Sequence, residues 1–124
     1  MISHFDHIVI TVTDIERSVN FYESILLMTP ITFSNGRRAM KFGNQKINLQ
    51  LLGQETRNKA GVGSADICLI SNWTTAKVIA HLQDKNIRIL EGPVEKSGAN
   101  GIIISVYIND PDLNLIEISN YKDS

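Results

Sequence analysis

The chain has 124 residues, a formal net charge of -1, 43% hydrophobic residues and 20% charged residues. These values fit one compact globular domain and argue against a disordered chain or a basic surface for nucleic acid. The single Cys68 excludes an internal disulfide, and the first residues lack the basic and apolar segments of a signal peptide. No apolar run is long enough to span a bilayer. We therefore expect a soluble, cytoplasmic protein.

The first half predicts a strand, a helix and three more strands. Residues 6–12 are rich in β-branched side chains, which favour a strand. Asp14 is a suitable N-cap for an amphipathic helix whose apolar residues recur at helical spacing as far as Leu26. Pro30 blocks its continuation. Strands joined by Asn-Gly and Gly-Asn turns are then expected over residues 31–34, 37–42 and 46–52.

The second half repeats this order after a polar linker that contains glycines, at residues 53–64. A strand is expected over residues 66–70 and a helix over residues 74–85. Three more strands are expected over residues 87–90, 102–108 and 115–119. The glycine-rich residues 91–101 are expected to form a mobile flap.

The repeated order predicts an α+β fold in which two tandem βαβββ modules form a curved mixed sheet around a cleft. The whole chain, residues 1–124, is then one domain, with module one at about residues 1–57 and module two at about residues 64–124. The repeat is inferred from element order and spacing, because the two halves share few identical residues.

Four polar side chains occupy matching positions in the predicted modules. His7 and Asp66 lie at the start of the first strand of each module. Gln50 and Glu117 lie in the last strand, each seven residues after the first residue of a turn. A two-fold arrangement would bring these four positions to one cleft. They are therefore the predicted metal ligands, and their oxygen and imidazole donors suit a divalent ion such as Mn, Ni, Fe or Zn.

The third strand of each module would add substrate-binding side chains to the cleft, namely Arg38, Met40 and Tyr107. Arg38 could pair with an anionic substrate group. Each candidate also has a structural explanation: Arg38 as a solvated hairpin residue, Tyr107 as a core residue and His7 as a hydrogen-bonded strand histidine. Glu117 is harder to explain in this way, because an acidic residue between apolar ones belongs either to a solvated sheet face or to a site.

Residues 6–12, 20–22 and 110–117 resemble the vicinal oxygen chelate superfamily. This superfamily includes glyoxalase I, the extradiol dioxygenases and the fosfomycin and bleomycin resistance proteins. The final motif, Asp-Pro-Asp followed by Asn-Leu-Ile-Glu, is specific for the superfamily and not for one reaction. Further segments resemble most closely the branch called glyoxalase-domain-containing protein 5, at residues 42–49, 66–70, 91–94 and 114–121.

The resemblance implies a small-molecule substrate and a homodimer. It also implies metal ligands at His7, Asp66, Glu117 and one fourth-strand position, which is Gln50, or Asn48 if the register differs by two residues. Asp66 stands where glyoxalase I and the dioxygenases usually carry histidine. The triad of two histidines and one carboxylate is therefore absent, and a dioxygenase is the least favoured activity.

Two functions are expected from these features. The first is a divalent-metal-dependent lyase or isomerase of the glyoxalase type, which acts on a small carbonyl or vicinal-oxygen substrate. Glu117 or Asp66 could leave the metal and act as the general base, and Glu117 is the expected catalytic residue. The second is a metal-free protein that binds or sequesters a small molecule, as the bleomycin resistance members do. An interaction module with a relic site is a third option. Neither nucleic acid nor a membrane is expected as a partner.

Overall fold

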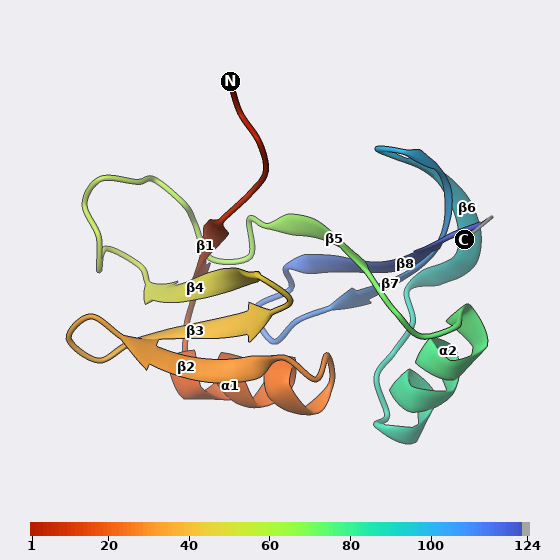
Figure 1. Cartoon of the computed structure of the whole chain (residues 1–124). Helices are drawn as coiled ribbons and strands as arrows, with labels where there is room; N and C mark the ends of the chain where they lie inside the picture. Colours follow the sequence, from red (N-terminus) through yellow and green to blue (C-terminus); the bar gives the residue numbers. More distant parts are fainter. Residues whose placement is uncertain (123–124) are drawn as a thin grey trace. The chain divides into compact units, whose positions relative to one another are not determined.

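The computed structural model describes residues 1–122. The chain forms two compact units, Met1–Ala65 (unit 1) and Asp66–Ser124 (unit 2). Each unit has a four-stranded mixed sheet and one helix (Figure 1). The element order is β-α-β-β-β in both units, so the predicted α+β fold of two tandem modules is confirmed. Neither described helix has the length and apolar character needed to cross a bilayer.

Unit 1 forms a sheet in the spatial order β1-β4-β3-β2, with β1 parallel to β4 and the other pairs antiparallel. Its elements are β1 (His7–Val12), α1 (Ile15–Ser24), β2 (Thr29–Phe33), β3 (Arg37–Phe42) and β4 (Gln45–Leu51). Asp14 caps α1 by accepting a hydrogen bond from the Arg17 backbone N–H at 3.1 Å. The turn between β2 and β3 has positive φ at Asn35 and Gly36, as a tight hairpin turn requires.

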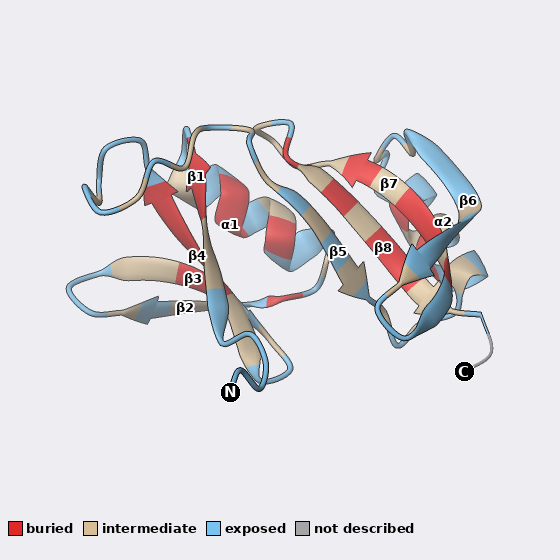
Figure 2. Cartoon of the chain, turned by 90° about the horizontal axis from the view of Figure 1, so that it is seen from above, coloured by how far each residue is buried: buried red, intermediate tan, exposed pale blue. Residues whose placement is uncertain are grey.

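Helix α1 covers one face of the unit 1 sheet and forms the core there. Val19 and Tyr22 are the buried apolar residues of the helix, and Tyr22 has no exposed surface. Figure 2 colours the buried parts of the ribbon red. The strands of unit 1 bury apolar side chains at Ile10, Val12, Met40, Ile47 and Leu49. Burial of this apolar surface is the main stabilising contribution to the unit.

Unit 2 repeats the arrangement in the order β5-β8-β7-β6. Its elements are β5 (Asp66–Ile70), α2 (Thr75–Asp84), β6 (Glu91–Gly98), β7 (Gly101–Asn109) and β8 (Leu115–Tyr121). Thr74 caps α2 by accepting from the Lys77 backbone N–H at 3.2 Å. The buried residues of the helix are Val78 and Leu82, and those of the strands include Val106, Ile108, Ile116 and Ile118.

Two expectations in unit 2 were wrong. Within the described residues, no strand forms at residues 87–90, and most of the expected flap is strand β6, which pairs with β7. Gly92 and Pro93 favour a loop in the sequence, but β6 is an edge strand, where both residues are tolerated. The register with β7 shifts between Glu91 and Val94, which accommodates the irregular start of the strand.

Each sheet therefore has one face that its helix covers and one helix-free face. Arg38 bonds to Glu16 of α1, and Asn120 bonds to Thr75 of α2, which marks the helix side of each sheet. Side chains of paired residues share a face. The helix-free face of unit 1 carries His7, Thr11, Phe33, Arg37, Lys46, Asn48 and Gln50, and that of unit 2 carries Asp66, Cys68, Ser105, Tyr107, Glu117 and Ser119.

Candidate functional site

His7 begins β1, and Asp6 fixes the orientation of its imidazole. Asp6 Oδ1 lies 2.7 Å from His7 Nδ1, and this hydrogen bond lowers the pKa of Asp6 below its ordinary value. In the neutral imidazole the contact holds the proton on Nδ1 and leaves the Nε2 lone pair free to accept. A carboxylate that orients an imidazole in this way is typical of metal-ligating histidines.

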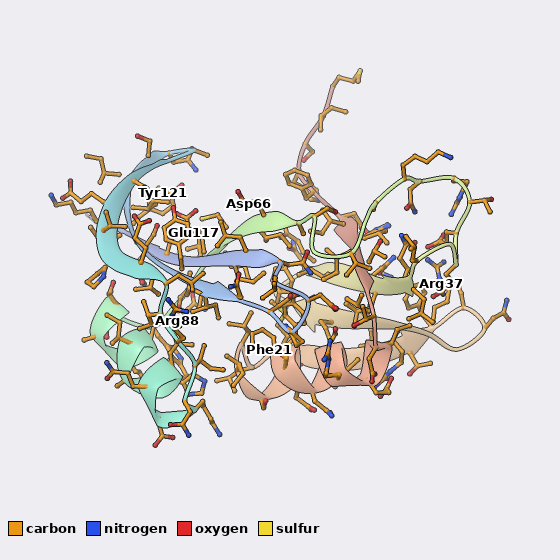
Figure 3. All side chains as sticks on the ribbon, turned by 180° about the vertical axis from the view of Figure 1, so that it is seen from behind. Phe21, Arg37, Asp66, Arg88, Glu117 and Tyr121 are labelled. Atoms are coloured by element: carbon orange, nitrogen blue, oxygen red, sulfur yellow. The ribbon has the colours of Figure 1, made fainter. Side chains whose placement is uncertain are left out.

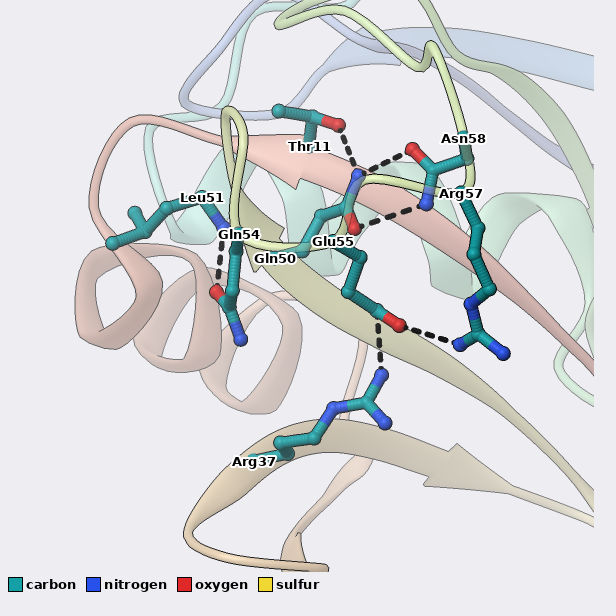
Figure 4. A network of polar contacts seen from close by, with 8 residues as sticks. All are labelled: Thr11, Arg37, Gln50, Leu51, Gln54, Glu55, Arg57 and Asn58. Carbon is teal, nitrogen blue, oxygen red and sulfur yellow. Dashed lines mark hydrogen bonds and ion pairs between the residues drawn. The ribbon is translucent and has the colours of Figure 1, made fainter.

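Gln50 is buried and engaged in a local network (Figure 4). Its Nε2 donates to Thr11 Oγ1 and to Asn58 Oδ1, both at 2.9 Å, and its Oε1 accepts from Asn58 Nδ2 at 3.2 Å. Thr11 in turn donates to the Ala60 carbonyl at 2.8 Å. The hydrogen bonds of Gln50 therefore join the segment after β4 to β1, and this structural role explains why Gln50 is buried.

Asn48 has the opposite property. Its side chain is buried, with 4% exposure, and Oδ1 has no hydrogen-bond partner within residues 1–122. A buried acceptor without a partner costs about 1–3 kcal/mol. Asn48 thus offers an unused oxygen on the helix-free face of unit 1, where a bound ligand or cation would satisfy it.

Turn spacing pairs Gln50 of unit 1 with Glu117 of unit 2, but the strand register pairs Asn48 with Glu117. His7 and Asp66 begin β1 and β5, and their cross-strand partners are Lys46 and Leu115. Two residues beyond these partners stand Asn48 and Glu117. Gln50 stands four residues beyond Lys46 and so matches Ser119. The turns differ in length, two residues at 43–44 and five at 110–114, so counting from a turn misplaces the match.

Glu117, labelled in Figure 3, lies in β8. Hydroxyl groups on the same face hold its carboxylate. Ser105 Oγ donates to Oε2 at 2.5 Å. Ser119 Oγ lies 2.7 Å from Ser105 Oγ and 3.5 Å from the same Oε2. Both serines are fully buried. Their hydroxyls fix one oxygen of the carboxylate, so the orientation of Glu117 is set before any ligand arrives.

Two ionisable side chains beside Glu117, Tyr107 and Cys68, stay protonated at neutral pH. Desolvation, followed by the Glu117 carboxylate, raises the pKa of Tyr107 to about 12. Desolvation also raises the pKa of the Cys68 thiol, whose Sγ lies 3.4 Å from Ser119 Oγ. Tyr107 is therefore a neutral hydrogen-bond donor, and Cys68 is a poor nucleophile.

Asp66, labelled in Figure 3, is the exposed first residue of β5.

Arg38 and Met40 lie on the helix side of the unit 1 sheet, and this differs from the expectation that they line a cleft with Gln50. Arg38 Nε donates to Glu16 at 3.0 Å and its guanidinium also donates to Thr32, while Met40 has no exposed surface. Period-two alternation separates them from the helix-free face. Arg37, one residue earlier, faces that side.

Arg37 belongs to a cationic cluster on this face that was not predicted from sequence. Its guanidinium lies 4.9 Å from the centre of the Phe33 ring, and Lys46 Nζ lies 3.5 Å from the same centre. Phe33 and Arg37 are cross-strand partners on either side of the tight turn. That hairpin pairing was the available signal, because partners across such a turn share a face.

The predicted metal ligands are divided between the units. His7 and Gln50 belong to unit 1, and Asp66 and Glu117 belong to unit 2. Within residues 1–122, no group of three or more His, Cys, Asp or Glu side chains is clustered so as to hold a metal ion. Each helix-free face by itself offers donors for part of a coordination shell.

Comparison with known proteins shows the family. The model of the Glyoxalase/Bleomycin resistance protein/Dioxygenase superfamily matches residues 4–118, and the chain belongs to this superfamily. It is similar to Virulence protein STM3117 of Salmonella typhimurium, at 46% identity over 98% of this chain and 86% of the relative. It is also similar to Glyoxalase domain-containing protein RDO1 of Mycosarcoma maydis, at 45% identity over 96% and 69%.

Solved structures share the fold of this chain. An integron cassette protein from V. cholerae is 47% identical over 98% of both chains, with a TM-score of 0.94. At lower identity the likeness shows the fold alone. FosX from Listeria monocytogenes, solved with Mn(II) and a sulfate ion, is 17% identical, with a TM-score of 0.70 over 99% of this chain and 94% of that one. TnmS3, an antibiotic-binding protein from Streptomyces, is 19% identical, with a TM-score of 0.77 over 98% of both chains.

Proposed function

We propose that the protein is a divalent-metal-dependent lyase or isomerase of the glyoxalase type that acts on a small carbonyl or vicinal-oxygen substrate. The proposed ligands are His7, Asp66 and Glu117, with Asn48 in the fourth-strand position that the sequence assigned to Gln50. We make no choice among Mn, Ni, Fe and Zn, because oxygen donors with one imidazole discriminate little among these ions.

The donors of each unit fit such an ion. His7 has a free Nε2 that Asp6 orients, and Asn48 has a buried oxygen without a partner. In unit 2, Asp66 is exposed, and both serine contacts of Glu117 go to the same oxygen. The proposal requires the two pairs of donors to meet, within one chain or between the two chains of a homodimer.

The observation that carries the proposal is the hydroxyl-held carboxylate of Glu117. A partly buried carboxylate such as that of Glu117 is costly unless it is hydrogen-bonded or paired. Ser105 and Ser119 supply neutral hydroxyls but no positive charge. A divalent cation would supply that charge.

A divalent ion held by these residues would supply Lewis acidity to a carbonyl oxygen of the substrate, which makes the adjacent C–H group more acidic. Glu117 is then the proposed base that takes the proton, and Ser105 is the residue that orients it. Tyr107, whose pKa is raised to about 12, is protonated at neutral pH and would donate a hydrogen bond to a substrate oxygen. Cys68 takes no part, because its raised thiol pKa keeps it protonated.

A second candidate function is metal-free binding or sequestration of a small molecule. The neutral amides of Asn48 and Gln50 favour it, since neither brings negative charge to the fourth strand of unit 1. In this case the orphaned Asn48 oxygen would accept a hydrogen bond from the ligand. The fold-level likeness to an antibiotic-binding protein agrees with this alternative without deciding for it.

Calorimetric titration of Mn²⁺ into chelator-treated protein separates the two candidates. The Glu117→Gln variant removes an anionic ligand and keeps the shape, so we expect its affinity to fall by at least about tenfold, or roughly 1.4 kcal/mol. Glu23→Gln changes an exposed glutamate of α1 and is the control with unaltered affinity. Equal affinity in all three proteins would refute the metal site and leave the binding function.

A further inference from the structure

We infer that the helix-free face of unit 1 binds a small hydroxy acid, with the anion on Lys46 and Arg37 and the hydroxyl on Asn48. This inference rests on the proposed function, because it names the substrate class of the same face. It starts from a cationic-aromatic cluster made of Phe33, Arg37 and Lys46.

The cluster places two cations on one ring. Lys46 Nζ lies 3.5 Å and Arg37 Cζ 4.9 Å from the centre of the Phe33 ring. The ring quadrupole attracts each cation, but the two positive charges repel each other. An anion that contacts both removes this repulsion.

The carboxylates nearby do not neutralise the cluster. Glu55 is shared by two guanidinium groups, with Arg37 Nη2 at 2.6 Å and Arg57 Nη2 at 2.9 Å, as Figure 4 shows. Within residues 1–122, no carboxylate lies within 4.0 Å of Lys46 Nζ; Asp6 is near enough for Lys46 to lower its pKa, but its ion pair is with His7. The cluster keeps positive charge although the whole chain carries -1.

The second recognition element is the unpartnered oxygen of Asn48. Asn48 Oδ1 is buried and can only accept, so in the absence of a cation an O–H or N–H donor satisfies it. Asn48 and Lys46 stand two residues apart on one face of β4, which sets their Cα atoms about 6–7 Å apart. The long, flexible side chain of Lys46 can bring its ammonium group towards Asn48, so the carboxylate and the neighbouring hydroxyl of one small molecule can contact both residues.

The ligand class follows from these two elements. A simple anion would pair with the cations but leave Asn48 Oδ1 without a donor. A neutral alcohol would donate to Asn48 Oδ1 but leave the cations without a counter-charge. A small hydroxy acid satisfies both, and its hydroxyl and carboxylate also carry vicinal oxygens. A keto acid has the charge but no donor for Asn48.

The test uses the intact chain with chelator present and no metal, followed by two-dimensional amide NMR. The probes are L-lactate, pyruvate and lactamide, which carry charge and hydroxyl, charge alone and hydroxyl alone. We expect lactate to shift the amide signals of residues 37 and 46–48. It should bind about tenfold more tightly than pyruvate, because pyruvate leaves the buried acceptor unpaired, and lactamide should bind hardly at all. Raising the salt concentration should weaken lactate binding.

Two variants assign the groups. Lys46→Gln should weaken lactate by at least about fivefold at low salt, and Lys46→Arg should restore part of the affinity. Lys85→Gln, at an exposed position in unit 2, should change nothing. Asn48→Ala should abolish the preference for lactate over pyruvate. The amide spectrum of each variant shows whether it is folded.

Equal binding of lactate and lactamide, or equal lactate binding by wild type and Lys46→Gln, would overturn the inference. Because this experiment contains no metal, such a result removes the proposed ligand class without touching the metal titration. Conversely, lactate binding with no Mn²⁺ binding would retain the ligand class and refute the metal-dependent enzyme.

Discussion

Asn48 stands in unit 1 where Glu117 stands in unit 2. Each lies two residues beyond the cross-strand partner of the residue that begins the parallel neighbouring strand. Glu117 is charged and held by serine hydroxyls, whereas Asn48 is neutral and its buried oxygen has no partner within residues 1–122. The two units thus offer an unequal pair of oxygen donors on equivalent strands.

Gln50 is expected to matter for stability, because its amide joins β1, β4 and the segment after β4. Gln50→Ala removes one hydrogen bond from Thr11 Oγ1 and two from the Asn58 amide, and should lower the free energy of unfolding by about 1–3 kcal/mol. Urea denaturation measures this loss. Gln83→Ala, at an exposed position in α2, is the control and should change stability by less than about 0.5 kcal/mol. A loss as small as the control's would show that the network is not stabilising.

Gly92 should be among the least replaceable glycines. It has a φ of 109°, and a Cβ there would lie 2.3 Å from the Ser105 carbonyl oxygen. The positive φ alone costs a residue with a Cβ about 1–3 kcal/mol, and the overlap with β7 adds to this cost. Gly61→Ala meets no atom within 4 Å and is the matched control. Thermal melts in which the two variants unfold together would contradict the close approach of β6 to β7.

Tyr107 should titrate late. Its pKa of about 12 exceeds the ordinary value of 10, so the folded protein holds this proton where the unfolded chain has lost it. This contribution to stability is complete below pH 10 and disappears as the pH rises from 10 to about 12. Tyrosinate absorbance, compared between wild type and Tyr107→Phe, isolates this group.

The same titration tests the contact with Glu117. Removal of the carboxylate charge in Glu117→Gln should lower the pKa of Tyr107 towards its ordinary value, while desolvation keeps part of the elevation. Glu23→Gln again serves as the control. An unchanged Tyr107 pKa in Glu117→Gln would contradict an electrostatic interaction between the two side chains.

Local signals predicted most of the fold. Asp14 marked the start of α1, Asn35-Gly36 marked the β2–β3 hairpin, and periodicity located both helices. Strand β6 was missed because Gly92-Pro93 is typical of a loop, and only its pairing with β7 makes it a strand. Pairing between distant segments is not encoded in the local pattern.

The site was harder to predict for the same reason. Glu117 could be singled out because a carboxylate interrupts an apolar strand. The choice between Asn48 and Gln50 depends on the register between β1 and β4, and turns of unequal length hide that register from sequence counting. The hydrogen bond between Gln50 and Asn58 also depends on the conformation of the loop after β4, which hydrophobic periodicity does not predict.

The central proposal is that Asn48, and not Gln50, occupies the ligand position on the fourth strand of unit 1. The most direct test is calorimetric titration of Mn²⁺ into wild type, Asn48→Asp and Gln50→Glu. An added carboxylate at a ligand position strengthens the binding of a hard cation, so Asn48→Asp should raise the affinity by at least about tenfold. Gln50→Glu should leave the affinity unchanged. A gain in Gln50→Glu with none in Asn48→Asp would contradict the assignment, and no gain in either would contradict a metal site on this strand.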